Sequence, residues 1–183
     1  MEKNILLSVI AGVLATILMA LTNLGTYVHE SAHKLMAHLL YRITSERLQM
    51  FPFLDTLLQR HGKKYGLYEY TSDGLTTIGQ YLGQNISSAL VYISGPIIDT
   101  AISLILYTLG HFLREINPNL SIALRAAGLV YFLSILNHVR GTIISKIGDL
   151  YSFSEKININ PLVIALIFAI SLPILVVITY LQN

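Results

Sequence analysis

The feature that most constrains this chain is a set of long apolar stretches with the length of a membrane crossing. The first, from Ile5 to Val28, contains no charged side chain. A helix of about 20 apolar residues crosses the roughly 30 Å hydrocarbon core of a bilayer. Three further stretches near that length follow at residues 86–109, 120–136 and 161–181. We therefore expect an all-α polytopic membrane protein with about four transmembrane helices.

The composition indicates the same environment and excludes several kinds of protein. Of the 183 residues, 54% are hydrophobic and only 12% are charged, which is too few charges for the surface of an ordinary soluble domain. The net charge is +2 and the longest basic run is Lys63-Lys64, so nucleic acid is not an expected partner. The chain has no cysteine, which excludes disulfides, thiolate metal ligands and a cysteine nucleophile. The expected surroundings are the lipid bilayer.

A polar segment at residues 41–84 separates the first two apolar stretches. Within it, alternating residues from Tyr65 to Tyr70 are followed by Ser-Asp-Gly at 72–74. Alternation with a period of two is typical of strands, and Ser, Asp and Gly together are typical of turns. We expect a small β-hairpin in this loop. Because the sequence has no internal repeat, residues 1–183 are expected to form one membrane-embedded domain.

The basic residues predict the orientation of the chain. With four spans, the N-terminus, the second loop and the C-terminus share one side, which holds Lys3, Arg114 and Arg125. The opposite side holds the other nine basic residues: Lys34, Arg42, Arg47, Arg60, Lys63, Lys64, Arg140, Lys146 and Lys156. Cytoplasmic loops carry the excess of Lys and Arg. The first and third loops should therefore face the cytoplasm in a multi-pass integral membrane protein.

The end of the first apolar stretch carries an HExxH motif, read as His-Glu-Ser-Ala-His at residues 29–33. On a helix, positions i and i+4 share one face, so His29 and His33 can bind a single metal ion. Glu30 lies about 100° round the same turn, where its carboxylate can act as a general base toward a metal-bound water. Ionisable residues at a membrane edge are costly and usually mark function. The motif therefore predicts a metal site.

A third ligand must come from elsewhere in the chain, because a catalytic zinc site normally takes three protein ligands and leaves a position for water. Asp149 is the candidate. It follows the third apolar stretch and so lies on the same membrane side as the end of the first. A carboxylate oxygen suits zinc alongside two histidines.

Three elements together resemble the site-2 protease family of intramembrane zinc metalloproteases. They are the HExxH motif, Ser-Gly-Pro-Ile-Ile-Asp at residues 94–99, and Asn137 followed by Asp149. Their order matches the family over about residues 5–151. The resemblance implies a three-helix core and the following roles: His29, His33 and Asp149 as zinc ligands, Glu30 as the catalytic base and Asn137 near the substrate carbonyl.

The implied activity is that of a zinc metalloendopeptidase. It would cut peptide bonds in or near the transmembrane segment of a membrane-tethered protein substrate, with its active site towards the cytoplasmic side. An exposed strand near Tyr65 to Tyr70 could hold the unwound substrate by β-augmentation. One alternative is a non-catalytic membrane metal-binding protein, a pseudo-protease or transporter; another is a structural subunit with a chance motif. Glu30 favours the enzyme, because simple metal binding does not need that carboxylate.

Several other ionisable residues have less defined roles. Asp99 lies inside the second apolar stretch, where an unpaired carboxylate would be protonated or bonded to a neighbour, and a place near the metal is open for it. His138 either neighbours the metal or is a helix-end side chain. His38, His61 and His111 are expected at the surface or the membrane interface, away from the proposed metal.

Overall fold

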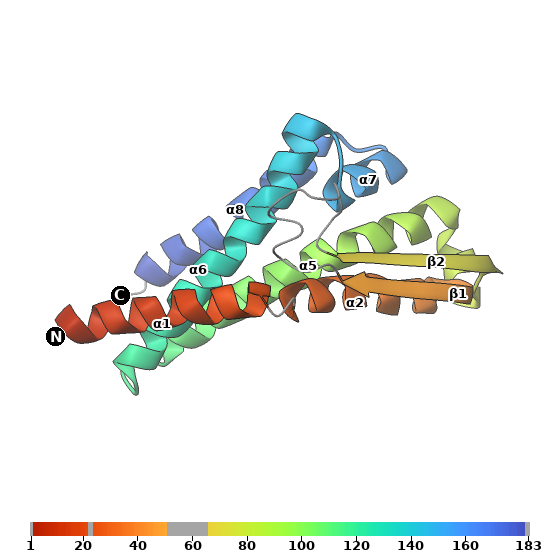
Figure 1. Ribbon diagram of the computed structural model, residues 1–183. Helices are drawn as coiled ribbons and strands as arrows, with labels where there is room; N and C mark the ends of the chain where they lie inside the picture. The colour runs from red at the N-terminus through yellow and green to blue at the C-terminus, as the bar shows by residue number, and fades with distance from the viewer. Residues whose placement is uncertain (1, 22–23, 51–65, 182–183) are drawn as a thin grey trace.

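The computed structural model describes residues 2–21, 24–50 and 66–181 of the chain. Its elements, in chain order, are α1 (Glu2–Leu21), α2 (Leu24–Leu40), β1 (Tyr41–Met50), β2 (Gly66–Leu75), α4 (Thr77–Leu82), α5 (Gln84–Phe112), α6 (Pro118–Arg140), the π-helix η1 (Gly141–Ser145), α7 (Asp149–Lys156) and α8 (Pro161–Leu181). Figure 1 shows α6 crossing α5, with α8 beside α6 and the hairpin over α2.

The described chain is mostly helical with one two-stranded antiparallel sheet, which confirms the expected helical fold with a small hairpin. Three helices are long and apolar enough to cross a membrane: α5, α6 with its extension to Ser145, and α8. They coincide with the last three predicted stretches. The first predicted stretch, residues 5–28, falls on two helices, α1 and α2, and residues 22–23 between them lie outside the described part. It is therefore not described as one continuous helix.

The hairpin pairs β1 with β2 from Tyr41 opposite Leu75 to Met50 opposite Gly66. The turn predicted at residues 72–74 is wrong, because β2 continues through these residues to Leu75. The turn-forming residues instead coincide with an irregular stretch, in which the register shifts and Gly74 adopts a φ of 145°. The rest of the predicted loop, residues 51–65, lies outside the described residues, and so does His61.

Local sequence signals explain where the helices near the site begin. The side chain of Thr76 accepts a hydrogen bond from the backbone N–H of Gly79 and so caps α4. In the same way Asn117 accepts from the N–H of Leu120 at the start of α6, where Pro118 occupies the first helical position. α5 and α6, which follow these caps, pack against each other.

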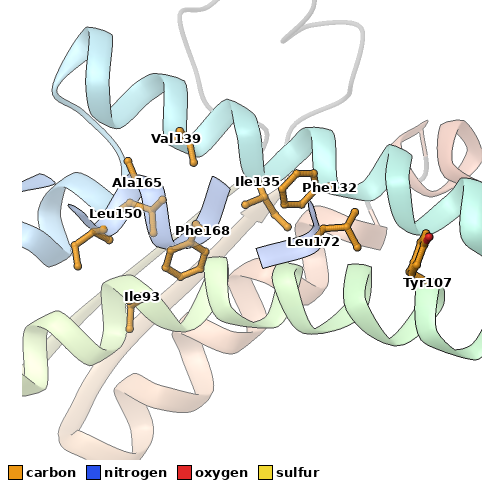
Figure 2. Packing of buried hydrophobic residues seen from close by; sticks show 10 residues of the cluster. Ile93, Tyr107, Phe132, Ile135, Val139, Leu150, Ala165, Phe168 and Leu172 are labelled. Atoms are coloured by element: carbon orange, nitrogen blue, oxygen red, sulfur yellow. The ribbon is translucent and has the colours of Figure 1, made fainter. Parts of the chain in front are cut away.

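The main hydrophobic core lies between α5, α6 and α8, as Figure 2 shows. Its buried residues are Ile93, Tyr107, Phe132, Ile135, Val139, Leu150, Ile164, Ala165, Phe168 and Leu172. Leu150 is completely buried and comes from the short helix α7. Burial of an aliphatic side chain contributes about 1.5 to 3 kcal/mol, so Leu150 anchors the start of α7 against α5.

A second, smaller cluster joins α2 to α5 and to the hairpin. It consists of Ala37, Leu40, Tyr41 and Val91. The tyrosine hydroxyl of this cluster also bonds the hydroxyl of Ser88 on α5 at 2.9 Å. The C-terminal half of α2 is thus held on one side by α5 and on the other by the hairpin, which fixes the face that α2 turns toward α5.

Candidate metal centre

The histidines of the HExxH motif lie one turn apart on the face of α2 that packs against α5. Both side chains are buried, with 7% of each residue exposed. Their rings meet edge to face with centroids 4.8 Å apart. The Nε2 atoms of His29 and His33 are 3.1 Å from each other. The i, i+4 spacing therefore does what the sequence predicts: it directs two imidazole nitrogens at one point.

Asp149 completes a triangle of ligand atoms with these two nitrogens. Its Oδ2 lies 3.3 Å from Nε2 of His29 and 3.7 Å from Nε2 of His33. Two ligands about 2.0 to 2.2 Å from a tetrahedral ion are themselves about 3.3 to 3.6 Å apart. The three measured separations, 3.1, 3.3 and 3.7 Å, span this value. The group could therefore hold a metal ion.

The backbone before Asp149 turns the chain back toward α2. The π-helix that extends α6 ends at Lys146, which adopts a left-handed conformation with φ 52°. Gly148 follows with φ 94°, a region that residues with a side chain rarely adopt. α7 then starts at Asp149 itself, and the next residue, Leu150, is locked in the core. Asp149 is thus aimed at the histidines by a turn on one side and an anchor on the other.

Both rings are held from behind by α5 through their Nδ1 atoms. Nδ1 of His29 lies 2.8 Å from Oδ2 of Asp99, and Nδ1 of His33 lies 2.6 Å from the carbonyl oxygen of Val91. A carbonyl or an ionised carboxylate can only accept, so each Nδ1 carries the proton and each neutral ring has its lone pair on Nε2. The hydroxyl of Ser94 also donates to the Val91 carbonyl.

With both rings neutral, the triangle brings three acceptor atoms together with no donor among them. Two imidazole lone pairs and a carboxylate oxygen repel one another unless a proton or a cation lies between them. A single dication would satisfy all three at once. This chemistry of the donor set, together with the separations of its atoms, fits a metal ion.

Gly95 makes room for the triangle. It lies between the two segments of α5 that hold the rings, and a Cβ atom at this position would stand 2.5 Å from Nε2 of His29 and 2.6 Å from Nε2 of His33. Real Cβ atoms essentially never come so close to another heavy atom. Any side chain here would therefore enter the space between the ligand atoms.

Glu30 follows His29 in α2 and is partly buried. Its Oε2 accepts a hydrogen bond of 3.0 Å from the backbone N–H of Tyr68 in β2. β2 pairs with β1 on its other side. The carboxylate thus lies between the histidines of α2 and the outer edge of the hairpin.

His138 of α6 also joins the site. Its ring stacks on that of His29 with centroids 5.0 Å apart, and its nitrogens lie 3.8 Å from Oδ2 of Asp99 and 3.8 Å from Oδ2 of Asp149. His29, Asp99 and His138 form a second overlapping group that could hold a metal. The neighbouring Asn137, predicted to approach the substrate, is exposed on α6.

A helical pattern in the sequence could have identified His138. It follows Tyr131 and Ile135, both buried, at spacings of seven and three residues. Residues at these spacings share one helix face, whereas Asn137 is rotated from His138 by about 100°. Of the two candidates, the buried face of α6 therefore carries His138.

Asp99, left open by the sequence, is buried with 3% exposure and has two hydrogen-bond partners. One is His29, described above; the other is Tyr131, whose hydroxyl donates to Oδ1 of Asp99 at 3.4 Å. His38 and His111 lie apart from the triangle, as expected. His38 is exposed and bonds Glu46 in β1, and His111 lies against Phe112 at the end of α5.

The charges around the site influence two carboxylates outside the apolar helices. Burial raises the pKa of the Asp149 carboxyl, but a proton carried by His29 or His33 at the triangle outweighs it and holds this pKa well below its usual range. Lys34 and then His38 lower the pKa of Glu46 to about 2. Both carboxylates are therefore ionised at neutral pH.

Comparison of this chain with protein-family models, curated proteins and solved structures gives no match. The function has to be argued from the geometry of the site.

Proposed function

We propose that this chain is an integral membrane zinc metalloprotease, which hydrolyses peptide bonds in or near the transmembrane segment of membrane-tethered proteins. The observation that carries the proposal is the triangle of His29, His33 and Asp149, with Glu30 following His29 in α2. Two imidazoles, one carboxylate and a non-ligating glutamate are the set that zinc hydrolases use. The resemblance to the site-2 protease family supports the same activity.

The chemistry divides between the metal and Glu30. A zinc ion held by the three ligands would polarise the scissile carbonyl and lower the pKa of water to about 7. The Glu30 carboxylate accepts a proton as the water oxygen bonds to the carbonyl carbon. When the C–N bond breaks, Glu30 returns this proton to the leaving amine. The hydrogen bond from the N–H of Tyr68 orients the carboxylate for both transfers.

We propose that α1 and α2 together form the first of four crossings. The triangle then lies where α2 meets the hairpin and α7, on the side that carries nine of the twelve basic residues. By the excess of Lys and Arg in cytoplasmic loops, this side faces the cytoplasm and both termini face outward.

The outer edge of β2 is the proposed place for the substrate backbone. Peptide bonds inside a helix are tied up in hydrogen bonds, so a substrate must unwind before it is cut. The N–H of Tyr68 points away from β1, and alternation along a strand directs the N–H of Tyr70 the same way. An extended substrate would add to this edge by β-augmentation.

A pair of variants tests this edge. Tyr70→Pro removes the N–H and the ring, whereas Tyr70→Ala removes only the ring. We expect cleavage to fall further in Tyr70→Pro than in Tyr70→Ala, with zinc retained in both. Equal cleavage by the two variants would contradict strand addition at this position.

The decisive experiment compares wild type with Glu30→Gln, measuring zinc by elemental analysis and cleavage of a model membrane substrate. The glutamine oxygen can still accept from Tyr68, so the ligands should be spared. General-base catalysis contributes about 10²- to 10⁴-fold, and we expect a loss of cleavage in that range with zinc unchanged. Glu155→Gln, an exposed carboxylate of α7, is the matched control. Zinc without cleavage in wild type favours a non-catalytic metal-binding protein, and no zinc overturns the proposal.

A further inference from the structure

We propose that Asp99 is a positioning residue of the metal centre, which holds His29 in its metal-binding orientation and balances part of the charge of the bound ion. The inference rests on the metal binding proposed above but not on proteolysis. It assigns a role to a buried carboxylate of α5 that touches a ligand and is not itself in the triangle.

The geometry fixes Asp99 from two sides. Its Oδ2 lies 2.8 Å from Nδ1 of His29 on α2, and its Oδ1 accepts from the hydroxyl of Tyr131 on α6. The nearest nitrogen of His138 is 3.8 Å from Oδ2, beyond hydrogen-bond distance. The short contact of Asp99 is therefore directed at His29.

This contact decides which nitrogen of His29 can bind a metal. An ionised carboxylate only accepts, so it keeps the proton on Nδ1 and leaves the lone pair on Nε2, which faces the triangle. Without an acceptor at this place, the ring is free to carry its proton on Nε2 and point it at His33 and Asp149. Metal-binding histidines are commonly held in this way by a carboxylate or a carbonyl on the other nitrogen.

Comparison of the two ligand histidines shows what the carboxylate adds. His33 is held at Nδ1 by the carbonyl of Val91, which is neutral, whereas His29 is held by a charge. The triangle supplies one negative charge, from Asp149, against the two positive charges of a dication. Asp99 adds a second negative charge in contact with a ligand, which matters because an uncompensated charge is costly in a poorly solvated site. We therefore assign Asp99 both a hydrogen-bonding and a charge-balancing role.

The test measures metal affinity and not activity. Zinc affinity of the purified full chain in detergent is determined by competition with a chromophoric chelator for wild type, Asp99→Asn and Asp99→Ala. Loss of an outer partner of a ligand typically weakens metal binding about 10- to 100-fold, which we expect for Asp99→Ala. Asp99→Asn keeps a hydrogen-bond acceptor but carries no charge, so its zinc affinity should fall less than that of Asp99→Ala. The control is Ser103→Ala, which removes another fully buried hydrogen bond of α5, one turn further on and directed at α6.

A spectroscopic readout separates positioning from general packing. In the zinc-loaded protein, ¹⁵N spectra of labelled histidine report the hydrogen bond at Nδ1 of His29. The Nδ1 signal should move in Asp99→Ala, which removes the acceptor, and should remain as in wild type in Ser103→Ala. If the alanine variant does not fold, Asp99→Asn, which has nearly the same shape, carries the test.

The outcomes separate this inference from the proposed function. One zinc per wild-type chain with unchanged affinity in both Asp99 variants overturns the role of Asp99 and leaves the metal centre intact. An equal loss of zinc affinity in Ser103→Ala also overturns the role of Asp99. Binding of two ions per chain overturns this role as well, because Asp99 would then be a ligand with His29 and His138. Absence of zinc from wild type overturns the metal centre and this inference with it.

Discussion

The two halves of α5 contain similar buried small and polar residues, which do different things. One, the site half (Val91–Asp99), faces the histidines of α2. The other, the packing half (Ser103–Gly110), faces α6. In both, glycine allows a neighbour to come closer than any side chain would permit. The difference lies in whether the polar atoms that meet there have partners.

In the packing half, donors and acceptors match. The hydroxyl of Ser103 donates to the carbonyl of Gly128 at 2.8 Å, and the guanidinium of Arg125 donates to the hydroxyl of Tyr107 at 3.1 Å. A Cβ at Gly128 would stand 2.9 Å from the backbone oxygen of Ser103. Close approach here serves helix packing, as small residues commonly do between apolar helices.

In the site half, the close approach gathers acceptors that lack a donor. Two acceptor atoms of α5 accept hydrogen bonds from the Nδ1–H groups of His29 and His33. The Nε2 lone pairs of the two rings then face Asp149. Polar groups buried in a structure normally have partners, so a convergent set of acceptors is what a group that could hold a metal ion would show. The comparison teaches that pairing, and not burial or polarity alone, distinguishes the candidate site from ordinary packing.

The largest effect is expected from adding one methyl group in the site half of α5 and one on α6 where it faces the packing half. Gly95→Ala places a Cβ among the ligand atoms, and Gly128→Ala places one against the backbone of α5. Overpacking costs about 1 to 3 kcal/mol of stability in either case. We expect zinc affinity to fall more than about 100-fold only in Gly95→Ala, beyond the range for an outer partner. Chelator competition and thermal unfolding in detergent measure the two effects; equal zinc affinity in both variants would contradict the assignment.

Removal of the metal should increase hydrogen exchange around the site half of α5 and leave exchange around the packing half nearly unchanged. A ligand bound only to the folded state stabilises it by about 2.7 kcal/mol at 100 times its Kd. Hydrogen exchange should therefore speed up on chelation in α2 and at the start of α7, which the triangle joins. Exchange along the contact of the packing half with α6 should change least. Uniform acceleration over all helices would show that the metal supports the whole fold.

A smaller effect is expected from Ser103→Ala, which leaves the carbonyl of Gly128 with one partner fewer. The net contribution of such a hydrogen bond is about 0.5 to 1.5 kcal/mol. We expect a loss of stability in this range by denaturant or thermal unfolding, with zinc affinity as in wild type. Weaker zinc binding in this variant would mean that the two halves are coupled through α5.

Sequence patterns predict those parts of this arrangement that depend on local spacing. The three apolar helices, the hairpin and the joint direction of His29 and His33 follow from periodicity within one element. The separation of α1 from α2 within one apolar stretch does not, because composition is continuous across it. The strand through residues 72–74 was not predicted, because pairing with β1 overrides the turn preference of Ser-Asp-Gly.

The arrangement behind the histidines is harder to predict, since it depends on the register between helices distant in sequence. His29 and Asp99 are 70 residues apart, and a rotation of α5 by one residue would aim a different side chain at the ring. Which of Asn137 and His138 faces the site depends in the same way on the rotation of α6 about its axis. Asp149 was predicted from topology and the family resemblance, whereas the turn at Gly148 that aims it becomes visible only in the structure.

The smallest expected effect concerns the contact between Glu46 of the hairpin and the C-terminal half of α2. Glu46 of β1 bonds both Lys34 and His38, and the hydroxyl of Tyr68 donates to it at 3.0 Å. Lys34 and then His38 lower its pKa to about 2 from the ordinary 4.5. A lowered pKa stabilises the folded form above the unfolded value, and this contribution is lost as the pH falls through the folded value. The contact should therefore be complete above about pH 4.5 and disappear toward pH 2.

Glu46→Gln tests this contact without touching the triangle. At pH 7 we expect faster hydrogen exchange in β1 and β2 only, because exposed ion pairs contribute little to global stability. Lowering the pH toward 2 should abolish the difference between variant and wild type in these strands. Glu69→Gln, an exposed carboxylate of β2, is the matched control and should exchange like wild type. A difference between Glu46→Gln and wild type that persists at pH 2 would show that shape, and not charge, holds the hairpin on α2.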